Sequence, residues 1–136
     1  MLLYEKLSCL ILLILVAILV VNNQYSEKYK VYGDWRGDFK GYELFFEFKS
    51  NHRFKLIFKD KVLKTSNVIK GNFYADYSKK PISLSLKNLP NTSHPLHTII
   101  KFKGNNLLTI EKFSTKEKFR PMIFSYEENM KLERSL

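Results

Sequence analysis

The chain has 136 residues, a formal net charge of +10 at pH 7 and a hydrophobic content of 45%. This length and this apolar content predict one packed domain and exclude a disordered chain. Nineteen of its 23 basic residues are lysines, which lack the planar fork that reads phosphates and bases, so the composition argues against nucleic-acid recognition.

The first predicted element is an apolar helix. Residues 7–21, LSCLILLILVAILVV, carry no charge and cover about 22 Å at the rise of an α-helix. We interpret residues 1–27 as a membrane anchor with a short linker, and Lys6 as reaching toward the head groups. A cleaved signal peptide is the alternative, although no pair of small residues at A-x-A spacing follows the apolar run. The short tail before the run resembles a signal anchor, which predicts a single-pass protein whose C-terminal domain lies on the non-cytoplasmic side.

Residues 28–127 are predicted to form the folded domain, and its first strand lies in VYGDWRGDF, residues 31–39. Trp35 is the only tryptophan and stands between Gly33 and Gly37, where the backbone can bend without a clash at Cβ. We expect the indole to fill one end of a closed barrel.

Alternation of apolar and polar residues dominates the rest of the domain. It is clearest in YELFFEFK (42–49), RFKLIFK (53–59), ISLSLK (82–87) and LHTIIKFK (96–103), and each segment is typical of a half-buried strand. Turn-forming residues separate such segments at intervals of about 8–12 residues. We therefore predict an all-β fold, an up-and-down antiparallel barrel of about eight strands, because closure removes exposed edges. A Greek-key sandwich is the alternative, and residues 128–136 are predicted to be a charged tail.

The inward face of these strands supplies the predicted core or ligand-lining residues. They are Leu44, Phe46, Phe48, Phe54, Leu56, Phe58, Leu84, Leu86, Ile100, Phe102 and Phe124. An eight-stranded barrel has room for side chains or one small ligand. Because so many of these residues are phenylalanines, we expect a largely filled interior and recognition by the surface or the rim.

Gly33 and Trp35 form a Gly-x-Trp pattern at the head of the first strand. This pattern resembles the lipocalins and the broader calycin superfamily, and also the small lipocalin-like domains of bacterial membrane-attached proteins. The resemblance spans about residues 31–127, including GNFYADYSKKPISLSL at 71–86. It implies a barrel in which a basic residue from the barrel end packs on the tryptophan, and Arg120 in FRPMIF is the residue matched to that role.

Residues that could carry chemistry are few. The three histidines, His52, His94 and His97, are predicted to lie in loops and at the rim without binding a metal. No pattern for nucleophilic catalysis or phosphate-loop binding is present in the sequence, so we expect a non-enzymatic protein without a cofactor. The predicted function is a membrane-tethered module, anchored through residues 7–21, that binds a protein partner or a small apolar ligand. The alternative is an accessory or assembly subunit of a membrane complex that contacts acidic lipid or protein surfaces.

Overall fold

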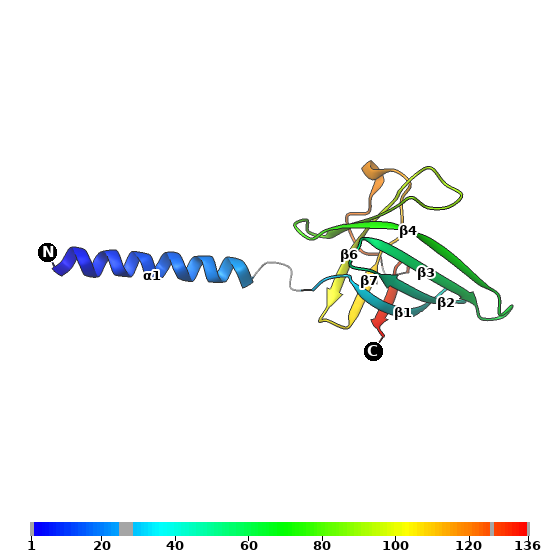
Figure 1. Cartoon of the computed structure of the whole chain (residues 1–136), viewed down its shortest axis with the longest axis horizontal. Coiled ribbons are helices and arrows are strands. Elements are labelled where there is room, and N and C mark those ends of the chain that lie inside the picture. Colours follow the sequence, from blue (N-terminus) through cyan, green and yellow to red (C-terminus); the bar gives the residue numbers. More distant parts are fainter. Residues whose placement is uncertain (1, 25–28, 126, 136) are drawn as a thin grey trace. The chain divides into compact units, whose positions relative to one another are not determined.

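The computed structural model describes residues 2–24, 29–125 and 127–135 (Figure 1). The chain divides into two compact units, Met1–Lys30 and Val31–Leu136. The domain boundary that the sequence predicts between residues 27 and 28 falls outside the described residues.

The first unit contains the helix α1 (Leu2–Gln24). Leucine, isoleucine and valine side chains are exposed along it from Leu3 to Val16. The prediction of an N-terminal helix is thus confirmed. Within the described residues, however, no helix reaches the length and apolarity that define a membrane span.

The second unit is a closed barrel of eight strands in which sequence neighbours are also spatial neighbours (Figure 1). Every neighbouring pair is antiparallel, including β1 with β8. The strands are β1 (Gly33–Phe39), β2 (Tyr42–Phe48), β3 (Arg53–Asp60), β4 (Ser66–Asp76), β5 (Ile82–Lys87), β6 (Leu96–Lys103), β7 (Leu107–Ile110) and β8 (Met130–Arg134). The predicted up-and-down antiparallel barrel is confirmed, and the sandwich alternative is wrong.

The alternating sequence pattern explains the interior. On β2, Leu44, Phe46 and Phe48 point inward and are buried, whereas the residues between them are partly exposed. The same two-residue period holds where β2 pairs with β3, with Phe46 opposite Leu56 and Phe48 opposite Phe54. Side chains from all eight strands thereby meet in one apolar core.

The C-terminal segment differs from its prediction. Residues 128–136 were expected to form a charged tail, but Met130–Arg134 form β8 and pair with both β7 and β1. Leu132 is buried in the core, while Lys131 and Glu133 are exposed. The charges that suggested a tail are therefore the outward residues of the strand that closes the barrel.

Residues 111–129, which we call the strap, connect β7 to β8. The strap contains one helical turn, the 3-10 helix η1 (Glu117–Phe119). Two backbone hydrogen bonds of 2.8 and 2.7 Å join its Ser114 to His97 of β6. The outward residues Ser83 and Ser85 of β5 are buried although they face away from the core. The strap therefore covers the outer face of β5 and β6.

Phe124, one of the predicted lining residues, belongs to the strap and not to a strand. The sequence places it on an inward strand face, yet it belongs to the strap and is only partly buried. The Lys101 ammonium lies 4.5 Å from the centre of its ring. Phe124 therefore packs outside the barrel, because the last strand begins six residues later at Met130.

Candidate ligand cavity

Trp35, near the start of β1, closes one end of the barrel. Its side chain is fully buried, and the indole Nε1–H donates a hydrogen bond of 2.8 Å to the carbonyl oxygen of Val31. The ring centre lies 6.2 Å from that of Phe102. The largest apolar side chain therefore fills this end, with its only polar group satisfied.

Arg134 of β8 holds this closed end together. Its Cζ lies 4.2 Å from the centre of the Trp35 ring. Nη1 donates to the carbonyl oxygen of Tyr32 at 2.6 Å, and Nε donates to that of Asn105 at 2.9 Å. A Cβ at Gly33 would lie 2.5 Å from this Nη1, so glycine leaves the space for the guanidinium. The cation–π contact and the hydrogen bond to Tyr32 thus connect β8 to the head of β1, and the hydrogen bond to Asn105 connects β8 to the turn between β6 and β7.

The basic residue over the indole is therefore Arg134, and the match to Arg120 is corrected. Arg120 lies in the strap, where Nη1 donates to the carbonyl oxygens of Leu84 and Thr98, each at 2.8 Å. Nη2 donates to Ser85 Oγ at 2.9 Å. Arg120 fastens the strap to β5 and β6 instead of sealing the barrel end. The sequence led to Arg120 because the folded domain was expected to end at residue 127, which placed Arg134 in the predicted tail.

The opposite end of the barrel is hollow. A cavity of about 670 Å³ lies there, within the usual range for small-molecule sites. It is bordered by Phe39 at the end of β1, by Met130 at the start of β8 and by the loop residues Leu89–Thr92. Because Trp35 and Phe39 stand at opposite ends of β1, the cavity opens away from the closed end. The expectation of a largely filled interior therefore holds only for the end that contains the indole.

The predicted lining residues divide between the cavity and the solid core. Of the predicted residues, five line the cavity, namely Phe46, Phe54, Leu56, Phe58 and Leu86. The residues that belong to the core without lining the cavity are Leu44, Phe48, Leu84 and Ile100, with Phe102 packed against them. Only Phe124, described above, lies outside both groups.

Sequence reasoning missed the rim of the cavity. Its main missed contributors are Phe39, Ile69, Leu96, Phe113 and Met130. Phe39 and Ile69 share the period of their neighbours and could have been found by extending the alternation along β1 and β4. Phe113 gave no such signal, because it lies in the strap, where no strand pattern marks the inward direction.

The lining limits the chemistry of a ligand. None of the described residues that line the cavity is charged, and its polar side chains are Asn67, Asn91 and Thr92. An ionised group placed inside would lose its hydration without gaining a counter-ion. The cavity therefore suits an uncharged apolar molecule whose polar end meets the amides and the hydroxyl.

His97 of β6 lies under the strap, beside Arg120. It is buried, not at the rim as the sequence suggested, and its Nδ1 lies 3.1 Å from both Ser85 Oγ and Arg120 Nη2. Burial, and next the charge of Arg120, lower the pKa of His97 below its ordinary value. The ring is therefore neutral at pH 7, and Nδ1 accepts a hydrogen bond from the guanidinium.

Glu111 anchors the other part of the strap. Its buried carboxylate accepts hydrogen bonds from the Ser125 N–H at 2.9 Å and the Ser125 Oγ–H at 2.7 Å. Burial alone would raise the pKa of Glu111, but hydrogen bonds from Ser125, the Lys112 N–H and Asn129 outweigh it and lower the pKa below its ordinary value. Glu111 is thus an ionised buried group held by neutral donors.

We expect the contribution of Glu111 to stability to disappear in acid. Because its pKa is lowered by folding, the stabilisation is complete above the pKa of an unfolded glutamate, about 4.3, and is lost as the pH falls through the lower folded value. Glu111→Gln should reduce the free energy of unfolding by about 1–3 kcal/mol at pH 7. Urea unfolding at pH 7 and pH 3 measures the difference between variant and wild type, which should shrink at pH 3. An unchanged difference would contradict this role.

No protein-family model, no curated protein and no solved structure matches the chain.

Proposed function

We propose that this protein is a membrane-associated, lipocalin-like binding module that holds a small, uncharged apolar ligand in the open end of its barrel. The observation that carries the proposal is the cavity of about 670 Å³ without a charged side chain among the described residues that line it. The role is binding, not catalysis, because the lining offers amides and a hydroxyl but no acid, base or charged electrophile.

Two features support the lipocalin-like assignment. The strands follow one another in order around a closed barrel. A Gly-x-Trp pattern heads β1, and an arginine from the last strand packs on its indole. A ligand would enter at the end remote from this closed end, between Phe39 and the loop Leu89–Thr92.

The membrane part of the proposal concerns α1. Its exposed side chains between Leu7 and Val16 are predominantly leucine, isoleucine and valine, and a helix that is apolar all round needs a nonpolar environment. We propose that this helix keeps the barrel at a membrane, on the non-cytoplasmic side. A tethered barrel would meet apolar molecules where they are most concentrated.

The test compares what three forms of the full-length protein carry. Wild type, Leu96→Trp and Tyr74→Trp are purified in the same detergent, extracted with organic solvent and analysed by mass spectrometry. Leu96→Trp places an indole in the cavity, whereas Tyr74 is 57% exposed and lies outside it. We expect a compound at near-equimolar amounts in wild type and Tyr74→Trp and at least tenfold less in Leu96→Trp.

Lipids bound to α1 should be equal in all three samples, so they provide an internal control. Identical extracts from the three forms would contradict ligand binding in the cavity.

A second candidate function, an accessory subunit of a membrane complex, is favoured by the strap. Met122 and Ile123 are 82% and 80% exposed, and Phe119 is 63% exposed. Neighbouring apolar side chains exposed to this degree are typical of protein contact sites. Clean extracts together with co-purifying membrane proteins would favour this role over ligand carriage.

A further inference from the structure

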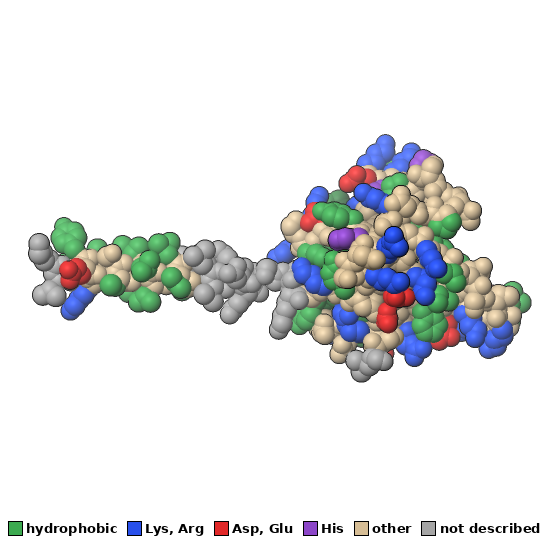
Figure 2. Space-filling model, viewed as in Figure 1, with side chains coloured by type: hydrophobic (Ala, Val, Ile, Leu, Met, Phe, Trp, Pro, Cys, Tyr) green, Lys and Arg blue, Asp and Glu red, His purple; other side chains and the backbone are tan. Residues whose placement is uncertain are grey.

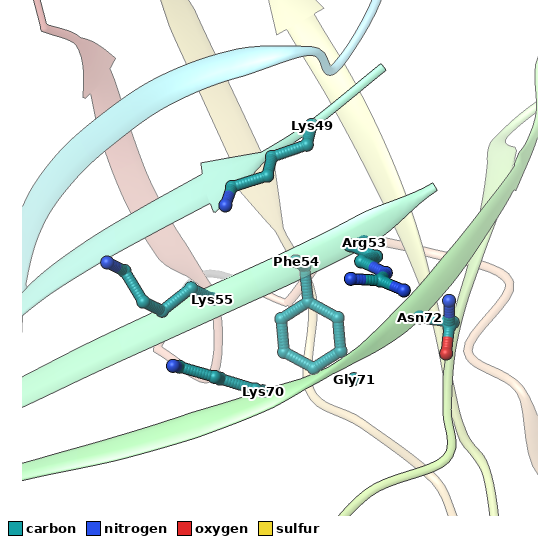
Figure 3. Close-up of a pocket in the computed structure, with 7 residues that line it drawn as sticks. All are labelled: Lys49, Arg53, Phe54, Lys55, Lys70, Gly71 and Asn72. Carbon is teal, nitrogen blue, oxygen red and sulfur yellow. The ribbon is translucent and has the colours of Figure 1, made fainter. Parts of the chain in front are cut away.

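A second pocket lies on the outer wall of the barrel and is lined mainly by cations (Figure 3). Its volume is about 430 Å³. Arg53 and Lys55 come from β3, Lys70 comes from β4, and Lys49 directly follows β2. Figure 3 shows the side chains of Lys49, Lys55 and Lys70 extending to one side of the Phe54 ring, and that of Arg53 on the other side, near Asn72. Figure 2 shows lysine and arginine side chains gathered over the face of β3 and β4.

Strand register brings these charges together. Arg53 and Lys55 are two residues apart on β3 and therefore share its outward face. Lys55 pairs directly with Lys70 of β4, and Arg53 pairs with Asn72. Two like charges directly opposite each other destabilise a sheet. The arrangement thus has a cost in the empty protein that a bound anion would remove.

The pocket is poor in compensating acids. Glu47 lies 3.6 Å from the Lys49 ammonium and 3.5 Å from that of Lys55. Among the described residues, neither Arg53 nor Lys70 has a carboxylate within ion-pair distance. Two of the four cations therefore share one carboxylate and the other two have none within ion-pair distance among the described residues, which leaves a local excess of positive charge.

We propose that this basic pocket binds a phosphate group. A phosphate presents several acceptor oxygens to different sides, which suits donors that come from β3, from β4 and from the residue that follows β2. Arg53 can engage two oxygens with its planar fork, and the lysines supply point charges. The pocket has room for a phosphate carried by a larger compound, either a free phosphorylated molecule or the head group of an anionic lipid.

The test uses the full-length protein in phosphatidylcholine nanodiscs and follows backbone amide NMR signals. One arm adds sodium pyrophosphate, and the other replaces part of the phosphatidylcholine by phosphatidic acid. We expect shifts of the amides of residues 49–55 and 70–72. A response to pyrophosphate alone identifies a free phosphate compound as the ligand, and a response to phosphatidic acid alone identifies a lipid head group. A response to both identifies a site for the phosphate itself.

The matched variants separate this site from general attraction to a basic protein. Lys55→Gln combined with Lys70→Gln should weaken the response at least tenfold. Lys103→Gln combined with Lys112→Gln removes the same charge from two exposed positions outside the pocket and should change it less than twofold. Equal loss in both pairs, or the absence of shifts in both arms, would overturn the proposal.

Discussion

Replacing Trp35 with alanine is expected to lower the free energy of unfolding by about 3–5 kcal/mol, the usual cost of emptying a buried tryptophan site. The side chain is fully buried, and its loss would also leave the guanidinium of Arg134 without the ring below it. The cavity could not collapse easily, because Arg134 is held by the carbonyl oxygens of Tyr32 and Asn105. A loss of this size is a large part of the stability of a small domain.

Two further substitutions separate the loss of the hydrogen bond and the general effect of removing an aromatic side chain from the loss of the buried ring. Trp35→Phe keeps a ring beneath Arg134 but removes the donor to Val31, and we expect it to cost about 1–3 kcal/mol. Tyr74→Ala removes an aromatic residue that is 57% exposed and should stay within about 0.5 kcal/mol of wild type. Urea unfolding followed by circular dichroism measures all three, since neither variant at Trp35 contains a tryptophan for fluorescence. A loss for Trp35→Ala no larger than that for Tyr74→Ala would contradict the closed-end structure.

Gly37→Ala is expected to open the seam between β1 and β8, at a cost of about 3 kcal/mol, the upper part of the range for added atoms in a packed site. A Cβ at this position would lie 2.4 Å from the carbonyl oxygen of Lys131 and 2.8 Å from Cδ2 of Leu132. The first of these atoms is backbone, so relief requires β8 itself to move. Among the described residues this seam has two paired positions, Trp35 with Arg134 and Arg36 with Glu133, and one further backbone hydrogen bond, from the Ser135 N–H to the carbonyl oxygen of Asp34 at 2.8 Å.

Gly104→Ala is the matched control, because the same methyl group there meets nothing within 4 Å. It is strained only by the positive φ of +65° and should cost about 1–2 kcal/mol. Hydrogen exchange of the full-length protein locates the damage. Gly37→Ala should accelerate exchange in β1 and β8 and leave the interface of β3 and β4 protected. Uniform acceleration in all strands, or equal losses in both variants, would refute the seam as the weak point.

The architecture could be predicted because period-two alternation and turn residues are local properties of the chain. Phe46, Phe54 and Leu86 all face the interior as their patterns indicate. The closing strand could not be recognised in the same way. In MKLER a single buried leucine stands among charged neighbours, and its partners are β1 and β7. Pairing over such a separation leaves no mark on a short window of sequence.

The cavity could not be predicted from the alternation of apolar and polar residues. Alternation shows that Phe46 and Phe58 point inward, but not whether rings from opposite walls meet. That depends on the loop at Leu89–Thr92 and on Phe113 of the strap, both of which border the open end. Arg120 was similarly ambiguous, because two of its hydrogen-bond acceptors are backbone carbonyls of β5 and β6, which any sequence offers.

The hydrogen bond from Arg134 to Tyr32 joins residues that are 102 positions apart. This separation determines how long β1 waits for β8 during biosynthesis. At about 5–20 residues per second, the ribosome adds Arg134 roughly 5–20 s after Tyr32. Until then β1 lacks one of its two neighbours, so the nascent chain exposes unpaired backbone groups along that strand. During those seconds β1 is an unpaired edge of the half-made barrel, open to pairing with a strand of another chain.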